Sequence, residues 1–163
     1  MTQLNRETVT SVSYKALIAT VNDDGSYLLS TPEPVAFSGL YAEIELAYLS
    51  PTLKNVMWTG DCVLNLPPDV AGAVPEFIPV PSEIVSAPRA HGCPVQIETR
   101  LTGKRSQKRG ASGWGRHSCV LEARILRVYI DPDVVLADDG RCGAKKWEAL
   151  ITCLRNASYT DIE

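Results

Sequence analysis

The chain has no long apolar run, and no stretch approaches the roughly 20 consecutive apolar residues that a membrane-spanning helix needs. Residues 1–15 are mostly polar and lack the apolar centre of a signal peptide. Neither charge is in large excess, since the formal net charge is −3 at pH 7, and so the composition gives no general attraction to nucleic acid. We therefore expect a cytoplasmic protein without a membrane or nucleic-acid partner.

Cysteine is sparse, odd in number and irregularly spaced, which argues against a disulfide framework. The five residues are Cys62, Cys93, Cys119, Cys142 and Cys153. Free cysteine behaves as a small hydrophobic residue in protein interiors. We therefore expect reduced, mostly buried thiols.

Histidine is rarer still, and each of the two histidines stands two residues before a cysteine, as His91 with Cys93 and His117 with Cys119. Two such pairs could in principle hold a tetrahedral zinc ion. The spacing between them is loose, however, and Cys93 has another explanation in the resemblance given below. We expect no metal site, and a histidine satisfied at the surface is the ordinary alternative to an acid–base role for His117.

What the chain does contain is the composition of an ordinary soluble domain. Its 163 residues are 45% hydrophobic and 21% charged, and this length is enough to bury a real core. No internal repeat interrupts the chain. We expect a single domain over residues 1–163.

The N-terminal half has the pattern of short strands and one helix. A β-prone run at residues 13–21 ends at residues 22–25, where Asp-Gly favours a tight hairpin turn. A second strand begins at residues 26–30, and Pro32 and Pro34 predict its end because proline cannot donate to a ladder. Two further β-like runs follow, at residues 35–38 and 41–49.

A short helix is predicted next, because its boundary residues fit the chemistry of helix ends. Ser50 is suited to the N-cap, and Pro51 to the first turn, where a missing N–H costs nothing. Gly60 is suited to the C-terminal cap. Residues 62–66 then resemble a buried strand.

The C-terminal half predicts a hairpin and a helix after an irregular segment. Residues 67–94 are rich in proline and predict an extended wrap over the domain. Residues 95–101 alternate apolar and polar, and residues 120–130 are their expected partner. Residues 104–115 form the polar loop between them, and residues 144–155 have helical periodicity. The sum is a mainly β, antiparallel barrel with one or two short helices.

Several segments, in this order, resemble the flavin-reductase-like family, whose fold is an FMN-binding split barrel. The resemblance extends from about residue 16 to 150 and implies an antiparallel split barrel, flavin-dependent oxidoreductase chemistry, and a homodimer with its sites at the subunit interface. The closest match is TLKNVMWTGDCVLNLP at residues 52–67. The others are PVPSEIV at 79–85, APR at 87–89, CPVQIE at 93–98 and LRVYID at 126–131, after an opening strand and turn at 17–25.

In that family the flavin is held by a hydroxyl-rich loop after the second strand and by a base followed by threonine where the helix begins. Such groups suit a phosphate, which needs hydroxyl and backbone donors, a cation and a helix N-terminus. The resemblance places the first loop at residues 30–34. It implies FMN-binding roles for Ser30 and Thr31 in that loop, and for Ser50 and Thr52 at the helix.

Four positions in these segments depart from the pattern. Glu33 and Pro34 stand where the family has hydroxyl residues, Pro51 replaces a base, and Leu53 replaces a further hydroxyl. A carboxylate repels a phosphate dianion, and proline removes a backbone donor. The chain also lacks roughly thirty residues that many relatives carry before the PVPSE segment. These departures predict weak or lost FMN binding.

A vacated flavin pocket would leave room for acid–base chemistry, for which we single out Glu33, Glu43 and His117. Glu33 lies in the segment that holds flavin in relatives. Glu43 and Glu45 share one face of a strand. If that face is solvent-exposed they are ordinary surface residues, whereas in a pocket they suit a general acid or base.

A basic cluster in the polar loop could attract an anionic substrate, or could simply be a solvated loop. Its members are Lys104, Arg105, Lys108, Arg109 and Arg116. Three functions remain open: an enzyme with a degraded flavin loop that acts on a small organic molecule in a biosynthetic pathway, a cofactor-free acid–base enzyme that cyclises, condenses or isomerises its substrate, and a non-catalytic binding protein.

Overall fold

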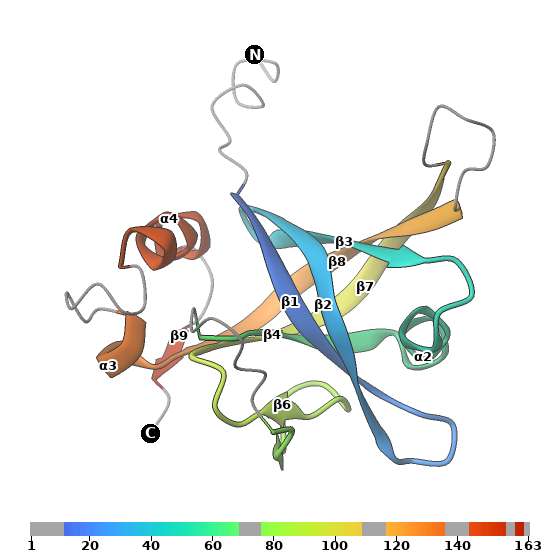
Figure 1. The fold of residues 1–163 in the computed structure, drawn as a ribbon, viewed down its shortest axis with the longest axis horizontal. Helices are drawn as coiled ribbons and strands as arrows, with labels where there is room; N and C mark the ends of the chain where they lie inside the picture. The colour runs from blue at the N-terminus through green and yellow to red at the C-terminus, as the bar shows by residue number, and fades with distance from the viewer. Residues whose placement is uncertain (1–11, 69–75, 109–116, 136–143, 156–158, 162–163) are drawn as a thin grey trace.

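Six antiparallel strands close into a barrel in the computed structural model, which describes residues 12–68, 76–108, 117–135, 144–155 and 159–161. Their order around the barrel is β3-β2-β1-β4-β7-β8, and pairing of β3 with β8 closes it (Figure 1). The strands are β1 (Val12–Val21), β2 (Tyr27–Ser38), β3 (Tyr41–Ala47), β4 (Asp61–Leu66), β7 (Val95–Lys108) and β8 (His117–Ile130). The predicted mainly β, antiparallel split barrel is confirmed.

The remaining elements lie at the ends and along one side of this barrel (Figure 1). They are α2 (Pro51–Thr59), α3 (Pro132–Val135), α4 (Ala144–Leu154), the short pair β5 (Pro79–Val80) and β6 (Arg89–Ala90), and β9 (Tyr159–Asp161), which runs parallel to β8. The helices predicted at residues 50–60 and 144–155 are therefore both present. No described helix has the length and apolar character to span a membrane.

The barrel interior is filled by alternate side chains from all six strands. Phe37, Leu64, Ile97 and Leu121 are each fully buried. Helix α4 covers one end, where the indole of Trp147 stacks on the ring of Tyr14 with centroids 6.3 Å apart. Burial of large apolar side chains is the main favourable contribution to folding, and here it fixes which face of each strand points inward.

Strand β2 runs through Pro32 and Pro34, so the prediction that these prolines end the strand, and that residues 30–34 form a loop, was wrong. Residues 35–38 are the end of this same strand. Pro32 and Pro34 pair with Leu17 and Lys15 of β1, whereas pairing of β2 with β3 begins only at Val35. That part of β2 is a sheet edge, where a missing N–H removes no ladder bond.

Helix α2 begins and ends as its sequence predicts. The Ser50 hydroxyl accepts a hydrogen bond from the Leu53 amide at 3.1 Å, and Pro51 opens the first turn. Gly60 has φ +79°, the left-handed conformation that glycine adopts without penalty, and its amide donates to the Val56 carbonyl at 2.7 Å. These caps fix where the chain enters α2, at the open end of the barrel.

The irregular segment 76–94, called the strap below, lies against the outer face of β1, β4 and β7, as the predicted wrap requires. Val85 and Ala87 pack on Ala19 and Val63 in one small apolar cluster. A second cluster contains Leu17 with Ala90 and Cys93. Few apolar side chains take part, so polar contacts must fix most of the strap.

Two buried carboxylates hold the first half of the strap. Glu98, fully buried on β7, accepts hydrogen bonds from the amides of residues 83, 84 and 85 at 3.1, 2.7 and 3.1 Å. It also accepts one from the Tyr129 hydroxyl, and burial together with this carboxylate raises the pKa of Tyr129 to about 12, which keeps that hydroxyl a donor. Asp61 on β4 accepts from the amides of Ser86 and Ala87 at 3.0 and 3.2 Å.

The side-chain amides of two buried residues, Asn65 and Gln96, hold the second half of the strap. The Asn65 side-chain oxygen accepts from the Ala90 amide at 2.9 Å. The Gln96 side-chain nitrogen donates to the carbonyls of Ala90 and Cys93 at 3.1 and 3.0 Å, and its oxygen accepts from Arg89 at 3.1 Å. The backbone of the strap thus finds its partners in side chains of the barrel, which a buried loop needs.

We expect Glu98→Gln to destabilise the protein, because an amide NH₂ group would face backbone donors in a buried site. An unsatisfied buried donor costs about 1–3 kcal/mol, and the free energy of unfolding from urea denaturation should fall by that amount. Glu122→Gln, on the exposed face of β8, is the matched control and should change it by less than about 0.5 kcal/mol. Equal effects of the two variants would contradict the role assigned to Glu98.

Two thiols should be inert in the native protein. Burial raises the pKa of both Cys62 and Cys93 to about 12, so almost no thiolate exists at pH 8. Iodoacetamide at pH 8 followed by mass spectrometry should leave both unmodified until urea is added. Because the ordinary thiol pKa is 9.0, the unfolded chain ionises first, and stability should fall as pH rises above that value. Rapid native alkylation of either thiol would contradict this assignment.

Candidate functional site

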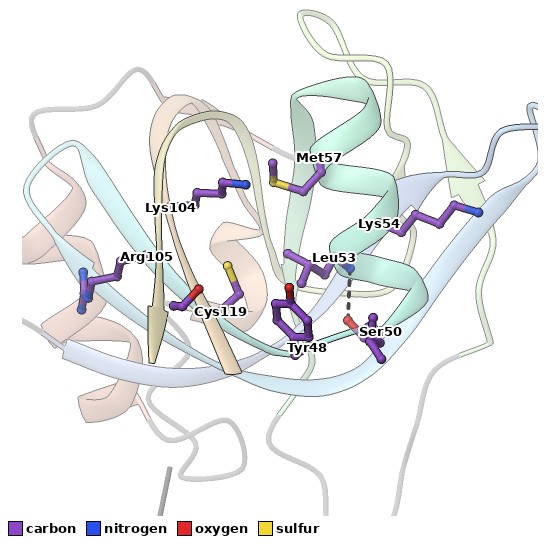
Figure 2. A pocket seen from close by; sticks show the side chains of 10 residues that line it. Tyr48, Ser50, Leu53, Lys54, Met57, Lys104, Arg105 and Cys119 are labelled. Carbon is purple, nitrogen blue, oxygen red and sulfur yellow. Dashed lines mark hydrogen bonds between the residues drawn. The ribbon is translucent and has the colours of Figure 1, made fainter. Parts of the chain in front are cut away.

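A cavity of about 350 Å³ lies at the open end of the barrel, between α2 and the extended ends of β7 and β8 (Figure 2). We call it the mouth cavity. Its walls come from four segments: the turn that enters α2, the helix itself, β7 and β8. The side chains that matter most for its chemistry are Tyr48, Leu53, Met57, Lys104, Ser106 and Cys119.

The register of the β7–β8 hairpin decides which side chains face this cavity. Lys104 pairs with Leu121, and Ser106 with Cys119. Directly opposed residues in an antiparallel pair point to the same face of the sheet. Since Leu121 and Cys119 belong to the barrel core, Lys104 and Ser106 extend that inner face beyond the core and into the mouth.

Arg105 lies between them and also borders the cavity, but its guanidinium points the other way. Its guanidinium forms an ion pair with Glu43 at 3.2 Å on the outer face of the barrel, and Figure 2 shows it directed away from Lys104. Both side chains are about half exposed, 57% for Arg105 and 46% for Glu43. Exposed pairs of this kind contribute little to stability.

The turn before α2 places large apolar side chains around the opening. Leu49 has φ +76° and is 86% exposed, which is an unfavourable conformation and an unfavourable position for a leucine. The positive φ of Leu49 follows from a tight turn, in which the Ser50 amide donates to the Ala47 carbonyl at 3.0 Å. Tyr48 and Met57 beside it are 56% and 41% exposed. Strained and exposed apolar residues gathered at a cavity are typical of binding sites.

The mouth cavity is electropositive. Figure 2 shows the Lys104 side chain reaching toward Met57, while Lys54 points outward from α2. None of the described residues that line the cavity carries a carboxylate. In a concave site with apolar walls, such a charge favours anions.

The first pair of hydroxyls assigned to FMN, those of Ser30 and Thr31, is used in hydrogen bonds to β1 and within β2. The Ser30 hydroxyl accepts from the Ile18 amide at 2.8 Å, at a bulge in β1, and donates to the Thr31 carbonyl at 2.7 Å. The Thr31 hydroxyl donates to the Glu33 carboxylate at 3.3 Å. These groups complete the pairing of β2 and face a carboxylate, which is a poor setting for a phosphate.

The second pair assigned to FMN, Ser50 and Thr52, belongs to the start of helix α2. The Ser50 hydroxyl is the N-cap of α2, and the Thr52 residue is only 5% exposed. Pro51 has no N–H to offer at the first helical position. The residues that the resemblance assigns to the flavin phosphate therefore do not fit that group.

The acid–base candidates do not converge on one site. Glu33 lies on β2, half-buried, and Glu43 lies on the outer face of β3 in its ion pair with Arg105. His117 starts β8, and its carbonyl accepts from the Tyr48 amide at 3.0 Å, so it adjoins the wall of the mouth cavity. Glu33, Glu43 and His117 are not among the side chains that line this cavity.

The histidine–cysteine pairs and the basic cluster were the other candidates for chemistry. Within the parts of the chain that the structure describes, no three His, Cys, Asp or Glu side chains gather in a metal-binding arrangement. Of the basic cluster, Lys104 and Arg105 take opposite faces, while the side chain of Lys108 and all of Arg109 and Arg116 lie outside what is described. Cys142 also lies outside it. Tyr48, Leu49 and Cys119 were not predicted as site residues.

Comparison with known proteins tests the fold. No protein-family model matches the sequence, and no curated protein matches it either. Among solved structures, 2-nitrobenzoate 2-nitroreductase NbaA of Pseudomonas fluorescens matches with a TM-score of 0.56 and 17% identity, covering 78% of this chain and 68% of that one.

Two further structures agree with it. Flavoredoxin of Desulfovibrio vulgaris matches with a TM-score of 0.55 and 18% identity, covering 86% of this chain and 81% of its own. Nitrilotriacetate monooxygenase component B of Bacillus cereus matches with a TM-score of 0.57 and 15% identity, covering 90% of this chain and 83% of that one. Together with the closed six-stranded antiparallel barrel, these matches show that the chain has the flavin-reductase-like split-barrel fold.

Proposed function

We propose that this chain is a flavin-reductase-like split-barrel enzyme that acts on a small organic molecule held in the mouth cavity, and that it binds FMN weakly or not at all. The observation that carries the proposal is the contrast between two regions. The mouth cavity is open, apolar-walled and basic, whereas the hydroxyls assigned to the flavin phosphate are committed to internal hydrogen bonds.

The structural neighbours supply the argument for a flavin. A flavoredoxin is among them, and a common fold makes FMN the first cofactor to test. Fold alone does not determine function, however, since one fold hosts many chemistries. The chain's own residues argue for altered chemistry. The Glu33 carboxylate takes up the Thr31 hydroxyl, and Pro51 stands where the family has a basic residue. A biosynthetic role for the reaction stays a prediction.

We expect FMN to bind with a dissociation constant above about 100 µM, which corresponds to less than about 5.5 kcal/mol of binding free energy. FMN fluorescence measured during titration with the protein tests this. The double variant Glu33→Ser with Pro51→Arg restores a hydroxyl and a cation, and it should bind at least about tenfold more tightly. A yellow wild-type protein with one FMN per chain would overturn the proposal.

Acid–base chemistry is a second candidate, and the position of His117 favours it. His117 is the one of the three acid–base candidates whose backbone contacts the wall of the mouth cavity, through Tyr48. Imidazole can exchange protons near neutral pH, which suits a general acid or base. Glu33 and Glu43 stay predictions for this role.

The chain's two histidines allow this to be tested by NMR. Naphthalene-1-acetate, a small aromatic anion, serves as the probe for the mouth cavity. When it is added, the ring proton resonances of His117 should shift if the imidazole touches the bound molecule. Those of His91, exposed on the strap, should not move. Histidine signals are assigned with His117→Gln and His91→Gln. A bound probe that leaves His117 unmoved would exclude it as a group that touches the ligand.

A homodimer, which the resemblance implies, is also part of this proposal. The exposed apolar side chains on α2 and the turn before it, Trp58 and Leu49 at 76% and 86% exposure, are of the kind that a subunit interface covers. Light scattering of the purified chain measures its mass directly. A monomer at micromolar concentration would contradict the dimer and leave the single-chain cavity as the site.

A further inference from the structure

The chemistry of the mouth cavity is more specific than a general ability to hold organic molecules. Its walls divide into an apolar side, made by the Tyr48 ring, Leu53 and Met57, and a polar side that includes Lys104 of β7 (Figure 2). Ser106 of β7 belongs to the polar side as well, since it shares the face of Lys104. Cys119, which is 5% exposed, forms the floor. The two sides face one another across the same space, so a bound molecule must have an apolar part and a polar part.

The charge of the polar side is positive and uncompensated. Among the described residues, no carboxylate forms an ion pair with Lys104, and the adjacent ion pair of Glu43 and Arg105 lies on the outer face. An ammonium group beside apolar walls gains from an anionic partner, because attraction between charges strengthens as water is excluded. A cationic or strongly basic ligand is disfavoured for the same reason.

The number of donors limits the anion to a small one. A phosphate dianion is usually held by several groups together, such as arginine forks, backbone amides and a helix N-terminus. Here the Ser50 hydroxyl already accepts from the Leu53 amide in the first turn of α2. Arg105 borders the cavity, but its guanidinium is engaged by Glu43, and Lys54 points outward from α2. One lysine with the Ser106 hydroxyl matches a carboxylate, which carries a single charge on two oxygens.

The size and shape of the apolar side indicate the rest of the ligand. A volume of about 350 Å³ lies at the lower end of the range for small-molecule sites. The Tyr48 ring offers a flat face, and methionine adapts to the shape of what it contacts. An aromatic group of one or two rings suits this wall.

We propose that the mouth cavity binds aromatic carboxylates, with the carboxylate at Lys104 and Ser106 and the ring against Tyr48, Leu53 and Met57. This inference rests on the proposed function, which places a small organic molecule in the same cavity, and adds the class of that molecule. Lys104 sets the specificity for the anion. The apolar wall supplies most of the binding free energy.

The experiment compares naphthalene-1-acetate with naphthalene-1-acetamide, which has the same rings and no charge. Ligand-detected NMR titration of the full chain gives both dissociation constants. The acid should bind at least about tenfold more tightly than the amide, and this preference should shrink as salt is added. Binding of the acid should also slow alkylation of Cys119, which provides a readout at the floor of the cavity.

Two matched variants test the role of Lys104. Lys104→Gln should weaken binding of the acid to the level of the amide and leave the amide unchanged. Arg100→Gln removes the same charge from an exposed position of the same strand, outside the cavity lining, and should change neither constant by more than about twofold. Equal weakening by both variants would show a general charge effect and overturn the assignment to Lys104.

A filling variant separates failure of this inference from failure of the proposed function. Ser106→Trp changes an exposed residue and should abolish binding of both probes by occupying the cavity. If acid and amide bind equally and Ser106→Trp blocks both, the cavity is a ligand site but the carboxylate class is wrong. If neither probe binds, or Ser106→Trp has no effect, the proposed small-molecule site itself fails.

Discussion

The arrangement of this molecule depends on two buried carboxylates that accept hydrogen bonds from backbone amides. Glu98 and Asp61 sit on the outer face of the barrel, where they are 0% and 7% exposed, and backbone amides of the strap satisfy most of their hydrogen-bonding capacity. A buried charge is costly unless it is hydrogen-bonded in this way. The strap can leave this position only by exposing its own amides and by stranding both carboxylates at once, so barrel and strap hold each other in place.

That constraint acts on the outer face of the barrel and does not involve the end at which the mouth cavity lies. Strands β7 and β8 extend beyond the closed part, and α2 stands beside them at a position fixed by its two caps. The turn that connects β3 to α2 must be tight, and it places Leu49 in a conformation that leucine avoids. Strain of this kind persists only when the surrounding structure holds it, and at the mouth cavity it keeps an apolar rim exposed.

Much of the fold could be predicted from the sequence because local chemistry determined it. The caps Ser50 and Gly60 predicted the ends of α2, and alternation predicted the pairing of β7 with β8. Both strands are longer than expected, because residues 104–108, predicted as loop, continue β7. The course of β2 could not be predicted, because the effect of Pro32 depends on whether a neighbouring strand lies on that edge, and this is a property of the whole sheet.

The site was less predictable for a related reason. The pairing of β7 with β8 shifts register twice, which leaves Leu126 of β8 unpaired at the first shift and Thr102 of β7 at the second. The unpaired Thr102 reverses which side chains of β7 face inward beyond it. Simple alternation along the sequence therefore could not separate Lys104, whose side chain reaches into the cavity, from Arg105, whose guanidinium turns to Glu43 on the outer face. The positive φ of Leu49 likewise leaves no trace in residue types, since leucine seldom adopts it.

The prolines of β2 affect how readily another chain can pair with the uncovered edge of that strand. An uncovered strand edge offers unpaired donors to any extended chain that meets it, and such edges begin the sheet-to-sheet association that leads to aggregates. Pro32 and Pro34 remove two of those donors at the segment that β3 does not cover. The two prolines therefore protect the barrel against unwanted strand addition along its open side.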